Sequence, residues 1–178
     1  MNHQNIAPIA IPNKRGVITK SIKKAVYYLN KGDVVAIPTE TVYGLAASID
    51  KENALKKIFE IKQRPYSNPL IVHIDAVESL DKIAKNIPEK AKLLAKHFWP
   101  GPLTVSDTIT ANKKTVAVRI PNHPVTLELI KKIGVPLAAP SANPFGSISP
   151  TSAKHVEKYF KNTLDVILDG GPSEKGIE

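Results

Sequence analysis

Short apolar runs alternate with amphipathic stretches along most of this 178-residue chain, and prolines or glycines stand at many junctions. The apolar runs are typical of buried strands. Between them, apolar residues recur at the i, i+3, i+4, i+7 spacing of one helix face, as in Ile22, Ala25, Val26 and Leu29. The alternation predicts an α/β fold, a β-sheet flanked by helices.

Each predicted strand is a short apolar run that ends at a turn. They are residues 33–37, 45–49, 70–74, 103–105, 115–120, 136–139 and 164–168. The polar 112–114 turn joins two of them as a hairpin, so we expect a twisted, mixed sheet rather than a parallel one.

Each predicted helix has an apolar stripe and a start or stop signal. The first helix runs from a cap at Thr19 to Gly32, and the second is 51–61, capped by Asp50. A short helix starts at Asp75, and another begins at Pro88 and buries Leu93, Leu94 and Phe98. The last two are 125–133, closed by Gly134, and 151–160, capped by Ser149 or Thr151.

Length and composition favour one domain, because 178 residues with 42% hydrophobic content suffice for a single core. Residues 1–16 are predicted to be an irregular N-terminal arm, and 17–178 the domain.

No apolar run approaches the roughly 20 residues of a membrane span, and no signal-peptide pattern precedes the domain. The absence of cysteine excludes disulfides and thiol catalysis. We therefore expect a cytoplasmic protein without a membrane partner.

The charge balance favours polyanionic partners, since 25 lysines and arginines against 16 acidic residues give a net charge of +9. A solvated helix surface explains many of these lysines equally well, as at Lys23-Lys24 and Lys131-Lys132. No RNA-binding signature motif is present.

Three segments carry most of the candidate chemistry, each where an apolar run meets a turn. They are 38–45 (PTETVYGL), 62–65 (KQRP) with 68–73 (NPLIVH), and 140–143 (PSAN) continuing to 149–151 (SPT). Together they offer hydroxyls, amides, an imidazole and two cations. This inventory suits a small polar ligand beside a phosphate chain.

Lys62 and Arg64 end a predicted helix, and their i, i+2 spacing makes them project differently. Both could then reach one elongated anion, with the arginine fork suited to phosphate or carboxylate. The alternative is a helix C-terminus that basic residues stabilise through its dipole.

Thr39, Thr41 and Tyr43 alternate along a stretch that would place three hydroxyls on one side if it is extended. Such hydroxyls suit a ligand with an amine and a hydroxyl. The alternative is hydrogen bonding within the turn itself.

His73 and Arg119 lie inside apolar strands, LIVHI and VAVRI. A strand histidine is more often a satisfied core residue than a ligand. A buried arginine needs an anionic partner, and no acidic residue is near Arg119 in sequence. A bound carboxylate or phosphate would supply that partner.

The turn at Ser141-Ala142-Asn143 follows a buried strand and can direct N–H groups and side chains at a phosphate. It is not a P-loop, and no Gly-x-Ser-x-Gly elbow occurs. No ligand cluster indicates a protein-held metal. Mg²⁺ carried with a nucleotide stays compatible with the sequence.

These segments, with 99–104, 116–124 and 136–151, resemble the YrdC-like family over about residues 17–178. The resemblance implies a twisted mixed sheet of YrdC/DHBP-synthase type. It also implies a nucleotidyltransferase that makes L-threonylcarbamoyl-adenylate and pyrophosphate from L-threonine, bicarbonate or CO₂, and ATP. Other transferase proteins would then modify tRNA adenosine with the product.

The resemblance also assigns roles to residues. Lys62 and Arg64 would hold the nucleotide phosphates and act as the catalytic cations. The remaining ATP-side positions would be Asn68, Thr115, Ser141, Asn143 and Ser149. Threonine would lie among Thr41, His73 and Arg119, with Ser141 able to contact either substrate.

The sequence departs from the family pattern at its end, GGPSEKGIE. Family members usually continue with a Ser-Thr pair and another strand, and many carry a second domain, so we expect a truncated catalytic domain. Two alternatives are a non-enzymatic double-stranded RNA or tRNA-binding module, and the carbamoyl-adenylate step of hydrogenase maturation. Zero cysteines and the short chain disfavour the latter.

Overall fold

The computed structural model describes residues 16–85, 87–110 and 113–177, and their side chains except at 105–115. The predicted N-terminal arm, apart from Gly16, lies outside the described residues.

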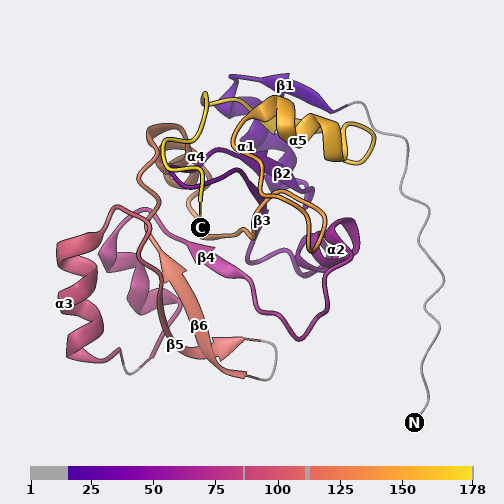
Figure 1. Cartoon of the computed structure of the whole chain (residues 1–178). Coiled ribbons are helices and arrows are strands. Elements are labelled where there is room, and N and C mark those ends of the chain that lie inside the picture. The colour runs from indigo at the N-terminus through magenta and orange to yellow at the C-terminus, as the bar shows by residue number, and fades with distance from the viewer. Residues whose placement is uncertain (1–15, 86, 111–112, 178) are drawn as a thin grey trace, which may run out of the picture.

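The described chain forms a mixed sheet whose eight strands are ordered β1-β8-β2-β3-β7-β4-β6-β5 (Figure 1). β1 with β8, β8 with β2, and β4 with β6 are parallel, and the other neighbours are antiparallel. The strands are β1 Val17–Thr19, β2 Val35–Ile37, β3 Gly44–Ser48, β4 Ile71–His73, β5 Val105–Thr110, β6 Lys113–Arg119, β7 Leu137–Ala138 and β8 Val166–Leu168. The predicted mixed α/β sheet and the hairpin of β5 and β6 are confirmed.

Helices cover both faces of the sheet. They are α1 Ile22–Asn30, α2 Glu52–Lys62, the 3₁₀ helix η1 Val77–Lys82, α3 Glu89–Phe98, α4 Pro124–Ile133 and α5 Ala153–Phe160. Successive side chains of β2 point to opposite faces of the sheet and so belong to two hydrophobic clusters. Val35 and Ile37 pack with α1 and α4, whereas Ala36 packs with α2 and α5. A third cluster joins β4 and β6 to η1 and α3.

Helix ends follow the sequence only in part. Gly134 closes α4 in the left-handed conformation, with φ at 73°, as predicted. The predicted N-caps are wrong: Ser21 caps α1 and Ser152 caps α5 through their side chains, and Lys51 precedes α2 without a side-chain cap. Asp50 instead accepts a hydrogen bond from Ser48.

The prediction that α3 buries Leu93, Leu94 and Phe98 is also wrong, since all three are exposed. The buried residue of α3 is Ala95, and Trp99, which is also buried, follows it by one turn. Ala95 and Trp99 belong to the cluster of β4 and β6, so the largest apolar residues of α3 do not mark its buried face. Strand β1 was not predicted, because three residues carry too little pattern to be recognised.

Candidate active site

The candidate site lies where the parallel strands β4 and β6 end beside β7. Register places His73 opposite Arg119, and Leu137 pairs with His73 from the other side. The 38–44 turn joins this edge because Leu45 N donates to Pro140 O at 2.8 Å and Ala142 N donates to Tyr43 O at 2.7 Å. The three segments singled out in the sequence therefore meet at one place.

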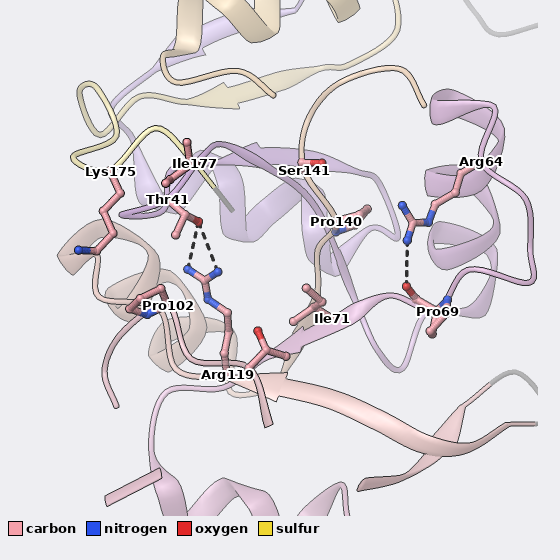
Figure 2. A pocket seen from close by; sticks show the side chains of 11 residues that line it. Thr41, Arg64, Pro69, Ile71, Pro102, Arg119, Pro140, Ser141, Lys175 and Ile177 are labelled. Atoms are coloured by element: carbon pink, nitrogen blue, oxygen red, sulfur yellow. Dashed lines mark hydrogen bonds between the residues drawn. The ribbon is translucent and has the colours of Figure 1, made fainter. Parts of the chain in front are cut away.

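A cavity of about 450 Å³ opens here (Figure 2), a size typical of small-molecule sites. Four predicted residues line it, Thr41, Arg64, Arg119 and Ser141. The remaining wall is formed by Pro69, Ile71, Pro102, Thr104, Pro140, Lys175 and Ile177.

Arg119 forms a buried ion pair with Glu40, with 2.8 Å between Nη2 and Oε1. Glu40 Oε2 also accepts from Asn122 N at 3.1 Å, and Thr41 Oγ1 accepts from Arg119 Nη1 at 3.3 Å. No acidic residue is near Arg119 in sequence, but the fold supplies one, because Glu40 reaches it from 79 residues away. Arg119 Nε is buried and has no hydrogen-bond partner among the described residues.

The three hydroxyls of the 38–44 turn do not face one way. Thr39 Oγ1 donates to Val42 O at 2.6 Å and accepts from Thr41 N, which is the turn bonding weighed as the alternative. Tyr43 OH donates to Gly171 O at 2.6 Å, and its burial raises the pKa of the phenol to about 12. Of the three residues, Thr41 alone lines the main cavity.

His73 is 3% exposed and lies in a narrow hollow with Thr41, Arg119 and Ser141. Burial, and secondarily the positive charge of Arg119, lowers the pKa of its imidazole to about 3. The ring is therefore neutral at physiological pH. Its Nδ1 atom has no hydrogen-bond partner in the described part of the chain.

The buried His73 is expected to make the protein less stable as the pH is lowered. The unfolded imidazole titrates near 6.5 and the folded one near 3, so the unfolded state binds more protons between these values. The free energy of unfolding should fall by about 1.4 kcal/mol per pH unit below about pH 6. His73→Gln should lose that slope in urea titrations at several pH values, whereas His155→Gln, at an exposed position, should keep it. Equal slopes in all three proteins would contradict the assignment.

Lys62 and Arg64 diverge because Gln63 between them ends α2 in the left-handed conformation, with φ at 53°. Lys62 is buried, and its Nζ donates to Ser141 O at 2.5 Å and Asn143 O at 2.6 Å. Arg64 lines the cavity, and its guanidinium donates to Asn68 O at 3.3 Å and Pro69 O at 3.2 Å. Lys62 thus fixes the 141–143 turn, while Arg64 faces the open space.

Among the other predicted ATP-side residues, the described side chains of Asn68, Asn143 and Ser149 do not line the cavity. Asn143 Nδ2 donates to Ser147 O at 2.6 Å and shapes the loop after the turn. Ser149 and Asn68 are half-buried and do not line the cavity. Thr115 lies in β6, and its side chain falls outside the described residues.

The C-terminal segment 169–177 forms a wall of the site that the sequence did not predict. Lys175 N donates to Glu40 O at 2.9 Å and Gly176 N donates to Thr41 O at 3.0 Å, so the segment follows the 38–44 turn (Figure 1). Gly170 passes so close to His123 that a Cβ would lie 2.5 Å from its ring. Two adjacent glycines such as those at 170–171 are typical of a turn, but the sequence alone does not show where that turn leads.

Lys175 and Arg64 stand on opposite sides of the cavity, with Arg119 between them (Figure 2). Because Glu40 already neutralises Arg119, an anionic ligand on that side gains from the exposed Lys175 ammonium. Lys175→Ala is expected to raise the KM for the ligand beside Arg119 by about two- to fivefold, with kcat little changed. Lys175→Arg should retain the wild-type KM, and a change in kcat alone would contradict this role.

A family model described as Telomere recombination, which covers the Sua5, YciO and YrdC proteins, matches residues 27–178. The chain belongs to this family. Two curated members of the Sua5/YciO/YrdC family are named threonylcarbamoyl-AMP synthase. The Pyrococcus abyssi protein is 50% identical over 165 residues, covering 88% of this chain and 48% of that protein. The Bacillus subtilis protein is 48% identical over 166 residues, with the same two coverages.

A solved structure of P. abyssi Sua5 in complex with L-threonine is also similar, with a TM-score of 0.85 and 46% identity. The match covers 90% of this chain and 51% of that one. The chain thus spans about half the length of these relatives. Both the recognised family and the predicted fold are confirmed.

No described helix is both long and apolar enough to cross a membrane. In the same residues, no group of three or more His, Cys, Asp or Glu side chains is placed to hold a metal ion.

Proposed function

We propose that this chain synthesises L-threonylcarbamoyl-AMP from L-threonine, bicarbonate or CO₂, and ATP, with release of pyrophosphate. The observation that carries the proposal is a single cavity lined by Thr41, Arg119, Ser141 and Arg64, in a chain 46% identical to a Sua5 that binds L-threonine. The curated relatives that share half of their length with this chain bear the name of that activity. The enzyme is a nucleotidyltransferase of tRNA modification, and we place it in the cytoplasm.

Threonine binds on the side of the cavity where Arg119 and Thr41 meet. The threonine carboxylate pairs with the Arg119 guanidinium, whose Nε is buried and unpartnered among the described residues. Glu40 accepts a hydrogen bond from Nη2 of that guanidinium and fixes its plane. The neutral ring of His73, which pairs with Arg119 across β4 and β6, adds no competing charge.

ATP lies toward Arg64, whose guanidinium is fixed by the Asn68 and Pro69 carbonyls and faces the phosphates. Lys62 contributes charge from behind the 141–143 turn and holds its shape. Ser141 stands between the two substrates, and Asn143, Ser149 and Thr115 complete the nucleotide side. Mg²⁺ enters as the counterion of ATP, because the described residues offer it no ligand cluster.

The chemistry needs no protein nucleophile. The threonine amine adds to CO₂ and gives up a proton to water, an oxygen of the resulting carbamate attacks the α-phosphate, and pyrophosphate leaves with the electrons of the broken P–O bond. Placing three reactants in one cavity removes most of the entropic barrier. Arg64, on the phosphate side, neutralises charge that develops on the leaving group.

Threonine binding tests this proposal without turnover. Calorimetry should show L-threonine binding more tightly than L-serine, and Arg119→Met combined with Glu40→Gln should weaken the binding of both amino acids while keeping the buried site neutral. Equal affinity for the two amino acids would contradict the assigned substrate.

An RNA-binding role without catalysis rests on the +9 charge and on the concave basic surface that the family resemblance implies. Such a module would bind double-stranded RNA or tRNA with an affinity that falls steeply with salt and ignores threonine and ATP. Under the proposed function, tRNA and the transferase proteins that use the intermediate are downstream partners.

A further inference from the structure

A second cavity, of about 380 Å³, lies behind strand β4. Its described lining is apolar except for one lysine, and consists of Ile49, Leu55, Phe59, Pro69, Leu70, Val72, Lys82, Ile83, Val116 and Ala138. The cavity has the volume and the mainly apolar wall of a small-molecule pocket.

The cavity lies on the seam between two hydrophobic clusters. Leu55 and Phe59 of α2 pack against the cluster of β2 and β3, Ile83 packs against the cluster of β4 and β6, and Ile49 touches both. These side chains are only partly buried, and the remaining part of each lines the cavity. Neither cluster fills the space between them.

The two cavities share strand β4 as their common wall. Ile71 lines the candidate active site, whereas its neighbours Leu70 and Val72 line the second cavity, as alternation along a strand requires. Pro69 lines both cavities, and its carbonyl accepts the Arg64 Nη2 hydrogen bond at 3.2 Å. A ligand behind β4 would therefore touch the residue that holds Arg64.

Lys82 gives the cavity its only charge among the described lining residues. Its side chain is exposed, and no ion pair or hydrogen bond to another described residue is found for its ammonium. A lysine stem commonly lies along apolar surface while its charged end stays in water. A ligand that complements this cavity would carry an anionic group at the end of an apolar chain.

We propose that this second cavity binds a small amphipathic carboxylate of the fatty-acid class. The acyl body fills the space between α2, β4 and η1, and the carboxylate meets Lys82. Occupation of the cavity shifts Pro69 and, through its carbonyl, the Arg64 guanidinium at the nucleotide side.

Calorimetry with octanoate, in the absence of ATP and threonine, tests the binding site independently of the catalytic proposal. Octanoate should bind, and 1-octanol, which lacks the charge, should bind about two- to fivefold more weakly. Lys82→Gln should reduce the affinity for octanoate to that of the alcohol. Lys85→Gln, an exposed neighbour outside the cavity, should not.

Variants that fill the cavity separate this site from nonspecific adsorption. Leu55→Trp on α2 and Ile83→Trp on the opposite wall are each expected to weaken octanoate binding at least about tenfold by occupying its space. Circular dichroism confirms which of the two variants is folded. Millimolar octanoate that fails to bind the wild-type chain, or that binds a folded tryptophan variant equally well, overturns the proposal.

The coupling to Arg64 has its own readout. In NMR spectra, the Arg64 Nε–Hε resonance should move as octanoate is added to the wild-type chain and stay in place for the tryptophan variant. Binding that leaves this resonance unmoved overturns the coupling through Pro69.

Discussion

Arg119→Ala is expected to lower the free energy of unfolding by about 3–5 kcal/mol and to weaken L-threonine binding at least about tenfold. The loss of stability arises because Glu40, only 2% exposed, would keep a negative charge without its 2.8 Å partner. The loss of affinity arises because the threonine carboxylate would face Glu40 without an intervening cation. Urea denaturation and calorimetry measure the two effects separately.

A double variant distinguishes these two causes. Glu40→Gln combined with Arg119→Met removes both charges from the buried site, so most of the lost stability should return. Threonine affinity should not return, because the carboxylate still has no partner. Wild-type threonine affinity in the double variant would show that Arg119 does not bind the substrate.

Arg64→Ala is expected to lower kcat/KM for ATP by about 100- to 1,000-fold. Its guanidinium faces the cavity, and two backbone carbonyls hold it in place, so it can neutralise phosphate charge without rearrangement. The free energy of unfolding should change by no more than about 2 kcal/mol, because the side chain is only half-buried and bonded to loop carbonyls. Steady-state kinetics at saturating threonine measures the effect.

The control for Arg64 is Lys56→Ala on the outward face of α2, the helix that precedes Arg64, where the ammonium pairs with Glu52 at 2.6 Å in solvent. It removes the same charge and should leave kcat/KM unchanged. If both variants lose activity equally, net charge rather than the position of Arg64 is responsible.

The sheet was predictable because each strand and helix carries its own local pattern. The run at 33–37 and the stripe of Ile22, Ala25 and Leu29 predict buried elements wherever they lie in the fold. Cap positions were less predictable, since Ser21 and Ser152 compete with nearby residues that have the same hydrogen-bonding capacity. Helix α3 shows a further limit, because its buried face is marked by a small side chain that hydrophobicity alone does not select.

The site was predictable in composition but not in its contacts. Thr41, Arg64, Arg119 and Ser141 could be selected by their positions at strand ends and turns, and all four line one cavity. The pairing of Glu40 with Arg119 depends on strand order, which sequence distance does not reveal. The inward direction of Lys62 depends on the left-handed Gln63, a non-glycine residue that gives no sequence signal.

Pyrophosphate release tests the central proposal most directly. The chain is incubated with ATP, magnesium and bicarbonate, first alone, then with L-threonine, and then with L-serine as the control amino acid. The account predicts pyrophosphate release that depends on L-threonine and bicarbonate and is far slower with L-serine. Release at the same rate without any amino acid, or no release from a folded chain that binds both threonine and ATP, would contradict it.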